Sequence, residues 1–275
     1  MNFQRADSSV VVLLENEAGR GVGQTSRSPV WKTMLYTLDI SARFLAASLW
    51  GRGSDVLADR LIDGYWRRIF RSGNARLTAT GREHFVPGQA YVVMSNHASI
   101  LDIPALMGAI PGSMRMVMKE ELKRVPLWGQ ALVASGFIPV DRKNRAKAIA
   151  QLDKAKQNLK KGVSVWVSPE GTRARDGKLA PFKKGGFHVA LGLGVPIIPA
   201  WIEGTQDIVP PDQFGVRLGG DAQVRFGAPI ATEGLGRDDI DGLIARVRAE
   251  ILALSGRAAE VDGAPASAQP KRRAA

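Results

Sequence analysis

The sequence predicts an α/β fold, a two-layer or three-layer sandwich with a largely parallel central sheet, preceded by an N-terminal amphipathic two-helix segment. Two observations support this prediction. After Arg76, apolar runs of strand length alternate with longer segments whose apolar residues recur at helical spacing. Such alternation is typical of a parallel sheet covered by helices. The chain also has 275 residues, of which 45% are hydrophobic, so it is long enough to bury one large core.

The N-terminal part is predicted to contain a leader and a pair of helices. Residues 1–29 are predicted to be a disordered leader, because their apolar run is too short for a secretory signal. Residues 30–72 are predicted to form two helices that dock on a membrane. In the first helix, Trp31, Leu35 and Leu38 recur at four- and three-residue spacing, which gives an apolar face.

The second predicted helix, over residues 56–70, places tryptophan and arginine side chains beside an apolar face. This combination is typical of the bilayer interface, where rings lie at headgroup depth and guanidinium groups meet lipid phosphate. Charges interrupt every apolar run well before the roughly 18 residues that a spanning helix needs. The alternative is a helical hairpin that packs on the main domain and has ordinary core aromatics.

The main domain is predicted over residues 73–254, and residues 255–275, rich in Ala, Gly, Arg and Pro, are predicted to be a disordered tail. Apolar runs predict strands at residues 90–94, 114–118, 136–140, 163–167, 195–201 and 222–226. Helical spacing predicts helices at residues 100–110, 127–135, 144–161, 185–193 and 237–254. Loops at the carboxyl ends of such parallel strands usually gather at one edge of the sheet and form the site.

The most informative motif lies where the first of these strands ends. His97 and Asp102 follow it, five residues apart. On a regular helix that separation leaves two side chains roughly 140° apart, so they can meet only if the chain turns between them. Ser95, Asn96 and Ser99 favour such a turn. The carboxylate would then hold one ring nitrogen and leave the other as a general base. The alternative is a hydrogen-bonded histidine on a helix cap.

Further blocks follow at intervals, each beside an apolar run. One strand leads to Arg142, and another leads into residues 170–173, Glu-Gly-Thr-Arg. Residues 181–187 read Pro-Phe-Lys-Lys-Gly-Gly-Phe, and residues 195–200 form an apolar run with two prolines. In this order and at these separations, over about residues 80–204, the blocks resemble the glycerolipid acyltransferase family typified by lysophosphatidate acyltransferase.

The resemblance implies that residues 73–254 are an acyltransferase domain, with no metal ion and no cofactor. His97 would take a proton from the acceptor hydroxyl, which attacks the acyl thioester carbonyl, and Asp102 would orient the imidazole. The acceptor would be the sn-2 hydroxyl of 1-acylglycerol-3-phosphate, a lysophospholipid, and the product phosphatidic acid. The donor would be acyl-CoA or acyl-carrier protein. The substrate-binding residues implied by the matched blocks are Arg142, Glu170, Gly171, Thr172, Arg173, Lys119 and Lys183.

The residue types support these roles without the resemblance. Arg142 and Arg173 can each hold an anionic headgroup through two N–H donors, whereas lysine gives less directional charge. Gly171 can adopt a positive φ without penalty, so the backbone can approach a ligand. Each arginine could instead be a solvated surface residue, and Glu170 could cap a helix or pair with Arg173. The lysine pair that includes Lys183 is the weakest of these assignments, since such pairs are usually solvated.

The net charge of +12 is concentrated in one segment, since residues 113–190 contain 17 Lys and Arg against 6 Asp and Glu. Such a positive field favours an anionic membrane surface, a phosphorylated acceptor and an acidic donor. Together with the docking helices it predicts a peripheral or monotopic protein on the cytoplasmic face of a membrane. Nucleic acid is not predicted as a partner, because no aromatic platform or nucleic-acid-binding motif accompanies the charge.

The composition excludes several classes of site. The chain has no cysteine and three histidines, so disulfides, thiolate metal sites and an acyl-cysteine intermediate are excluded and a histidine-rich metal site is disfavoured. The glycine spacing after Gly171 does not fit a phosphate loop, and no Gly-x-Ser-x-Gly motif of a serine hydrolase occurs. Two alternatives stay open: an acyltransferase for a different lyso-lipid acceptor, and a non-catalytic basic membrane-binding protein.

Overall fold

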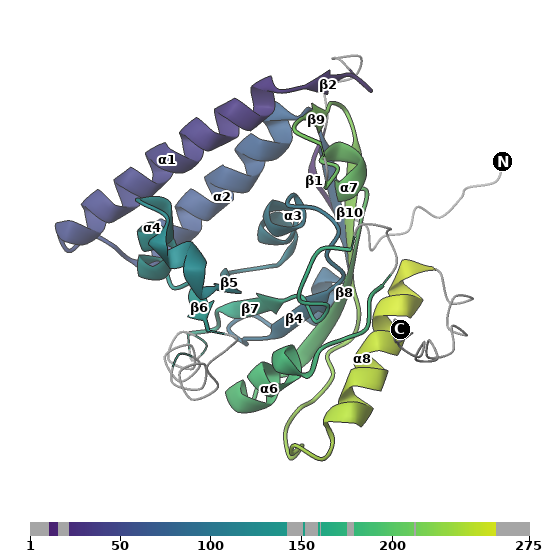
Figure 1. Cartoon of the computed structure of the whole chain (residues 1–275). Helices are drawn as coiled ribbons and strands as arrows, with labels where there is room; N and C mark the ends of the chain where they lie inside the picture. Colours follow the sequence, from purple (N-terminus) through teal and green to yellow (C-terminus); the bar gives the residue numbers. More distant parts are fainter. Residues whose placement is uncertain are drawn as a thin grey trace, which may run out of the picture.

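The computed structural model describes residues 11–15, 22–141, 151, 159, 161–174, 179–211 and 213–256. Its main strands are β1 (Val11–Leu14), β3 (Arg76–Thr80), β4 (Val92–Ser95), β5 (Met114–Lys119), β6 (Ile138–Val140), β7 (Ser164–Val167), β8 (Ile197–Glu203) and β10 (Asp221–Phe226). They form one sheet in the order β1-β3-β10-β8-β4-β7-β5-β6 (Figure 1). A separate pair of short strands consists of β2 (Thr25–Ser26) and β9 (Val216–Arg217).

The sheet is largely parallel, as predicted. Strands β8, β4, β7, β5 and β6 are mutually parallel along the sheet, and β3 is parallel to β10. The antiparallel pairs are β10 with β8 and β1 with β3. All six predicted strands are present, with ends shifted by two residues at most. The carboxyl ends of the parallel strands therefore share one edge, which is where ligand sites form in such sheets.

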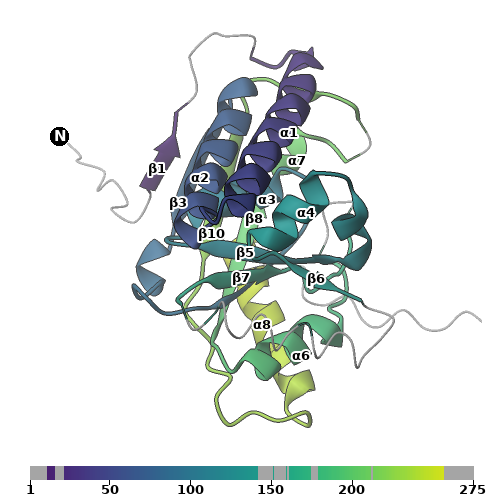
Figure 2. The same ribbon diagram turned by 90° about the vertical axis from the view of Figure 1, so that its left-hand side faces the viewer.

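The described helices are α1 (Ser28–Leu49), α2 (Asp55–Ser72), α3 (Asp102–Ala109), α4 (Trp128–Ala134), α6 (Lys184–Leu193), α7 (Thr205–Ile208) and α8 (Ile240–Ser255), with 3-10 turns η1 (Arg82–His84) and η2 (Glu120–Arg124). Helices α1 to α4 lie on one side of the sheet, and α6 and α8 lie on the other (Figures 1 and 2). The predicted helices near residues 100–110, 127–135, 185–193 and 237–254 correspond to α3, α4, α6 and α8.

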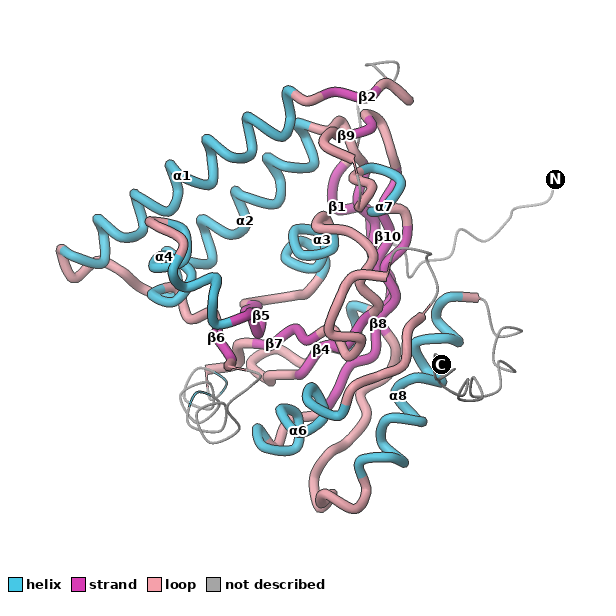
Figure 3. The backbone as a smooth tube through the Cα atoms, viewed as in Figure 1, coloured by secondary structure: helices cyan, strands magenta, loops and turns pink. Residues whose placement is uncertain are grey.

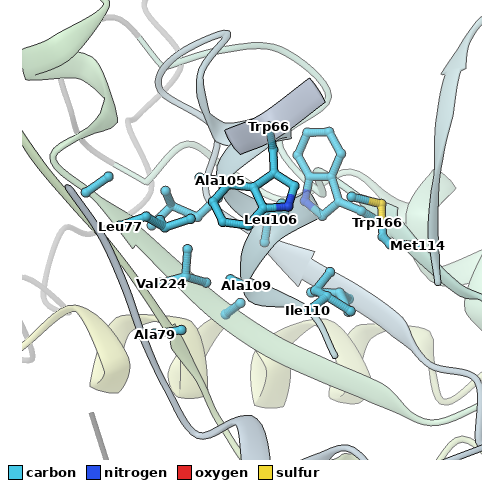
Figure 4. Close-up of a cluster of buried hydrophobic side chains, with 14 of the residues drawn as sticks. Trp66, Leu77, Ala79, Ala105, Leu106, Ala109, Ile110, Met114, Trp166 and Val224 are labelled. Carbon is cyan, nitrogen blue, oxygen red and sulfur yellow. The ribbon is translucent and has the colours of Figure 1, made fainter. Parts of the chain in front are cut away.

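The central strand β4 shows why the sandwich has three layers. Tyr91 and Val93 belong to the core beneath α2 and α3, where Trp66 and Leu106 pack (Figure 4). Val92 and Met94 belong to the second core, beneath α6 and α8. Successive side chains of a strand point to opposite faces, so burial of both faces requires a continuous apolar run rather than an alternating one.

Helices α1 and α2 lie in the predicted N-terminal segment, and some of their apolar residues are buried while others are exposed. Helix α2 begins at Ser54, whose hydroxyl accepts a hydrogen bond from the Leu57 N–H at 3.1 Å. Trp66 and Phe70 of α2 are buried in the domain core, as the hairpin alternative predicts. Leu35 of α1, by contrast, is 68% exposed. Of the described helices, none combines the length and the apolar content needed to cross a bilayer.

The expectation that residues 1–29 are disordered throughout is wrong in three places. Val11 and Val12 pair with β3 at the edge of the sheet, Thr25 and Ser26 pair with β9, and Ser28 begins α1. The physical reason is that the short apolar run satisfies its backbone groups on an open sheet edge. The predicted helix at residues 144–161 falls mostly outside the described residues, as does the predicted tail beyond residue 256.

Strand β3 was not predicted, although its sequence carries the signal. Leu77 and Ala79 are buried, and the alternate residues Arg76, Thr78 and Thr80 are partly exposed. Alternation with a period of two is the pattern of a strand with one buried face. The run is short and Ala79 is small, so its apolar content is low compared with the six strands that were predicted.

Candidate functional site

The site begins where β4 ends, with His97 on the turn that leads into α3. His97 Nδ1 lies 2.7 Å from Asp102 Oδ2. The predicted turn therefore exists and brings the two side chains together, with Asp102 as the first residue of α3. The Asp102 side chain is fully buried, whereas the His97 side chain is 16% exposed. The carboxylate thus lies behind the ring, and the ring reaches the surface.

Asp102 is held by the turn that it closes. Its Oδ2 also accepts hydrogen bonds from the Ala98 N–H at 2.8 Å and the Ser99 N–H at 2.9 Å, and its Oδ1 accepts one from the Thr205 hydroxyl. Asp102 Oδ2 accepts hydrogen bonds from two backbone N–H groups, so it is also the acceptor toward the imidazole. His97 Nδ1 therefore carries the proton and donates a hydrogen bond to Asp102. The lone pair of His97 is then on Nε2, so that nitrogen can accept a proton.

Asn96 anchors this turn to the neighbouring strand. Its side-chain amide donates to the Ile202 carbonyl at 2.8 Å and its side-chain oxygen accepts from the Ile202 N–H at 2.8 Å. The side chain thus replaces a backbone unit in the pairing between β4 and β8. Beside it, the Trp166 ring lies edge-on to the His97 ring, with centroids 5.3 Å apart, and Trp166 Nε1 donates to Ser95 Oγ at 3.0 Å. From the sequence, Asn96 was predicted only as a turn residue, and Trp166 was not predicted as part of the site.

Glu170, which follows β7, connects the histidine turn to the next loop. Its side chain is buried, with 2% relative exposure. Oε1 accepts from the His97 N–H at 2.9 Å, and Oε2 accepts from the Ala180 N–H at 2.8 Å. The Ala174 N–H in turn donates to the His97 carbonyl at 2.7 Å. The backbone of His97 is therefore bonded on both sides to the loop that carries Glu170, and Glu170 uses both carboxylate oxygens for positioning.

Burial raises the pKa of Glu170, because removal from water penalises its charged form. The hydrogen bonds from Ala180 and His97 oppose this shift but do not cancel it. The folded state therefore binds the proton more tightly than the unfolded state, whose glutamate pKa is about 4.3. Consequently the contribution of Glu170 to the free energy of unfolding falls as pH rises through the interval between these two pKa values.

We therefore expect the stability difference between the wild type and Glu170→Gln to narrow as pH rises from about 4 toward neutrality. Urea unfolding midpoints of both proteins across this range measure the difference. Glu121→Gln, which changes an exposed glutamate of η2, is the matched control. A difference that widens with rising pH would contradict the prediction, since it would mean that the two N–H donors outweigh burial.

Gly171 and Lys183 are neighbours in the same loop region. Gly171 has a φ of +74°, and a Cβ at this position would lie 3.2 Å from Lys183 Cδ and 3.3 Å from Lys183 Nζ. The Lys183 side chain therefore lies close against Gly171. A glycine suits this position because it adopts the positive φ without strain and has no Cβ to crowd the lysine. Thr172 and Arg173 follow on the surface, where both are exposed.

The structure thus brings most of the predicted site residues to one edge of the sheet. Lys119 is exposed at the carboxyl end of β5, two strands from β4 in the sheet order. Arg142 lies outside the described residues. Thr205, at the start of α7, was not predicted, and only its contact across the sheet identifies it. Among the described residues, His, Cys, Asp and Glu side chains do not form a group of three or more that could hold a metal ion.

Together these residues can supply a base beside a cationic surface. His97 Nε2 can accept a proton, and the buried carboxylate of Asp102 can stabilise the imidazolium that results. Lys183 and Arg173, on the loop bonded to His97, can attract an anionic group. The arrangement suits deprotonation of a hydroxyl on a negatively charged molecule.

A family model described as Acyltransferase matches residues 76–203 of the chain. The human 1-acyl-sn-glycerol-3-phosphate acyltransferase alpha is 40% identical over 178 residues, which are 64% of this chain and 62% of the human protein. The chain thus matches about three fifths of the length of that curated relative. A Caenorhabditis elegans protein, provisionally named 1-acyl-sn-glycerol-3-phosphate acyltransferase acl-2, is 30% identical over 221 residues, 80% of this chain and 77% of that protein.

A solved structure has the same fold. The crystal structure of the 1-acyl-sn-glycerophosphate (LPA) acyltransferase PlsC from Thermotoga maritima superposes with a TM-score of 0.63 at 22% sequence identity. The match covers 88% of this chain and all of that one. At this identity the likeness is one of fold, and it agrees with the three-layer architecture.

Proposed function

Because the chain belongs to the acyltransferase family, we propose that it transfers a fatty acyl group to the sn-2 hydroxyl of 1-acylglycerol-3-phosphate and so produces phosphatidic acid. The acyl donor in this proposal is acyl-CoA or acyl-carrier protein. The observation that supports it most strongly is the pairing of His97 Nδ1 with Asp102 at 2.7 Å, which leaves Nε2 to act as the base. The names of the human and nematode relatives support the choice of acceptor.

The proposed reaction uses the chain's own residues and the two substrates. His97 Nε2 takes the proton of the acceptor hydroxyl as its oxygen attacks the thioester carbonyl carbon. The tetrahedral intermediate then collapses, the C–S bond breaks, and the leaving thiolate takes the proton back from the imidazolium. Asp102 stabilises the imidazolium between these two steps and keeps the ring oriented.

We assign acceptor binding to the loop after β7. The cationic groups of Arg173 and Lys183 would hold the phosphate, and Gly171 and Thr172 would let the backbone come close to it. Lys119, at the same sheet edge, would add positive charge. Glu170 differs from the other proposed substrate-binding residues, because both of its carboxylate oxygens already accept hydrogen bonds from the backbone N–H groups of His97 and Ala180.

We assign membrane docking to α1 and to the segment that packs beside it. Trp31, Leu35 and Leu38 are 56%, 68% and 46% exposed, and the exposed Phe214 ring contacts Trp31 edge-on at a centroid distance of 6.0 Å. The Arg68 guanidinium lies 4.4 Å from the centre of the Tyr36 ring, which places positive charge near the apolar residues. This surface fits a peripheral or monotopic protein on the cytoplasmic face of a membrane.

Free thiol released from acyl-CoA, with and without lysophosphatidate, tests the proposed reaction. Thiol release that depends on the acceptor supports it, and parallel reactions with acyl-carrier protein identify the donor. A panel of other lyso-lipids distinguishes the alternative acceptor. Absence of thiol release with every donor and acceptor would reject catalysis and favour the non-catalytic membrane-binding alternative.

Replacing Leu35 and Leu38 together by Asn is expected to weaken binding to anionic phospholipid vesicles by about tenfold or more, since burying one leucine contributes about 1.5 to 3 kcal/mol. Vesicle co-sedimentation measures the bound fraction. Val86→Asn is a matched control, because Val86 is 56% exposed in the connection that follows η1. Equal binding by the double variant and the wild type would remove α1 from the docking surface.

A further inference from the structure

The C-terminal helix α8 lies outside residues 76–203, yet it contacts the loop that leads away from Glu170. Residues 179–183, here called the strap, join that loop to α6 and have no regular secondary structure. The described parts of the connection between β7 and α6 are drawn as loop in Figure 3, with α8 close by. Because the strap forms neither a helix nor a strand, hydrogen bonds to side chains contribute to holding it in position.

Arg248 of α8 supplies those contacts. Its Nη1 donates to the Ala180 carbonyl at 2.8 Å, and its Nη2 donates to the Leu179 carbonyl at 3.1 Å. The guanidinium also lies 5.2 Å from the centre of the Phe182 ring. One planar group thus binds two successive carbonyls and an aromatic ring of the strap, which a lysine cannot do.

The strap is also linked to His97, through Glu170. The Ala180 N–H donates to Glu170 Oε2, and Glu170 Oε1 accepts from the His97 N–H. A further bond joins the Lys183 N–H to the Pro169 carbonyl at 2.9 Å, beside Gly171. The strap is therefore hydrogen-bonded to α8 through the Leu179 and Ala180 carbonyls and to the Glu170 loop through the Ala180 and Lys183 N–H groups.

Displacement of the strap would leave the buried Glu170 carboxylate without one of its donors. A buried charged group that loses its hydrogen-bond partner is strongly destabilised, so Glu170 would move or admit water. Either response changes the bond between Glu170 and the His97 backbone. The nearby ion pair of Lys184 with Asp241 also joins the start of α6 to α8, but both side chains are exposed and such pairs contribute little.

We propose that Arg248 is a positioning residue: through the strap and Glu170 it fixes the backbone of His97 and the place of Lys183. The inference rests on the proposed acyl transfer for its kinetic consequence, but the connection itself is independent of the substrate. Arg248 touches neither substrate in this scheme. It acts by holding the base and the cationic loop in one arrangement.

Three variants test this inference in the full chain. Arg248→Met removes both hydrogen bonds and keeps an unbranched apolar stem, and Arg248→Lys keeps the charge but lacks the planar group that presents two N–H donors to the carbonyls. Arg246→Met is the matched control, because Arg246 is exposed on the same helix. Circular dichroism and thermal unfolding establish that each variant is folded.

Two measurements are made on every variant: kcat with lysophosphatidate and acyl-CoA, and the backbone amide signals of ¹⁵N-histidine-labelled protein. The chain has three histidines, so the spectrum contains few signals, and His97→Ala identifies the one from His97. Arg248→Met is expected to lower kcat by about 10- to 100-fold, as misplacement of a catalytic group does, and to shift the His97 amide signal. Arg248→Lys should restore part of both, and Arg246→Met should change neither.

A folded Arg248→Met with unchanged kcat and an unmoved His97 amide signal would overturn the inference, as would equal losses in Arg246→Met. If Arg248→Met does not fold, Arg248→Lys and Arg248→Gln decide on the same two measurements. Failure of the proposed function is distinguishable: the wild type would then release no thiol, while the His97 amide signal would still shift in Arg248→Met and support the positioning role.

Discussion

We expect His97→Ala to lower kcat for the proposed acyl transfer by about 10²- to 10⁴-fold, the usual contribution of a general base, while the chain keeps its fold. The fold is retained because Asp102, which loses the ring, still accepts from Ala98, Ser99 and Thr205. The partly exposed ring also leaves no closed cavity behind. Acceptor-dependent thiol release from acyl-CoA, measured on purified folded protein, checks the result.

Two further variants separate loss of the base from loss of structure. His97→Gln retains a side chain that can donate to Asp102 but cannot take a proton, so its kcat should fall as far as that of His97→Ala. His84→Ala, in η1, should leave kcat unchanged. Retained turnover in folded His97→Ala or His97→Gln would reject His97 as the base.

The pairing of His97 with Asp102 could be predicted from the sequence because the turn that brings them together is built from local contacts. The strand, the turn and the start of α3 lie within residues 92–102, and the Asp102 carboxylate binds N–H groups three and four residues before it. Each of these features follows from short-range rules for strand ends and helix starts. The hydrogen bonds that hold the pair in place from elsewhere in the chain were not predicted, because their partners are far away in the sequence.

Asn96 and Thr205 show why the distant contacts could not be found. The partner of Asn96 is Ile202, 106 residues later, and Thr205 meets Asp102 across 103 residues. Nothing in the local sequence of α7 distinguishes Thr205 from a solvated threonine. The apposition depends on β8 lying beside β4 in the sheet, and sequence alternation predicts the presence of strands but not their order.

Glu170 shows a different limit of sequence reasoning. The residue was predicted to contact the substrate. Its two oxygens instead accept backbone N–H groups from His97 and Ala180, 73 residues before it and 10 residues after it. A carboxylate in a loop can bind a ligand or organise the loop, and only burial and hydrogen-bond partners separate these roles. The direct contact of Glu170 with substrate stays a prediction, while its contact with His97 is part of the structure.

Asp102→Asn is the second substitution with a large expected effect, about 100-fold or more in kcat. The amide oxygen of Asn would occupy the Oδ2 position, where the Ala98 and Ser99 N–H groups and the imidazole donate. Its NH₂ group would then face the Thr205 hydroxyl, which can rotate to accept. The fold and the ring orientation are therefore kept, and what is lost is the negative charge that stabilises the imidazolium during transfer.

The measurement that checks this expectation combines kcat with the ¹⁵N shifts of the His97 ring nitrogens, which report the nitrogen that carries the proton. In Asp102→Asn the proton should remain on Nδ1 while kcat falls. Asp207→Asn, an exposed carboxylate on the same short helix as Thr205, is the matched control and should leave kcat unchanged. If Asp102→Asn instead moves the proton to Nε2, the amide has adopted the opposite orientation, and the loss of activity reports the wrong tautomer rather than the missing charge. Wild-type turnover in folded Asp102→Asn would show that the buried carboxylate only shapes the turn and takes no part in stabilising charge on the ring.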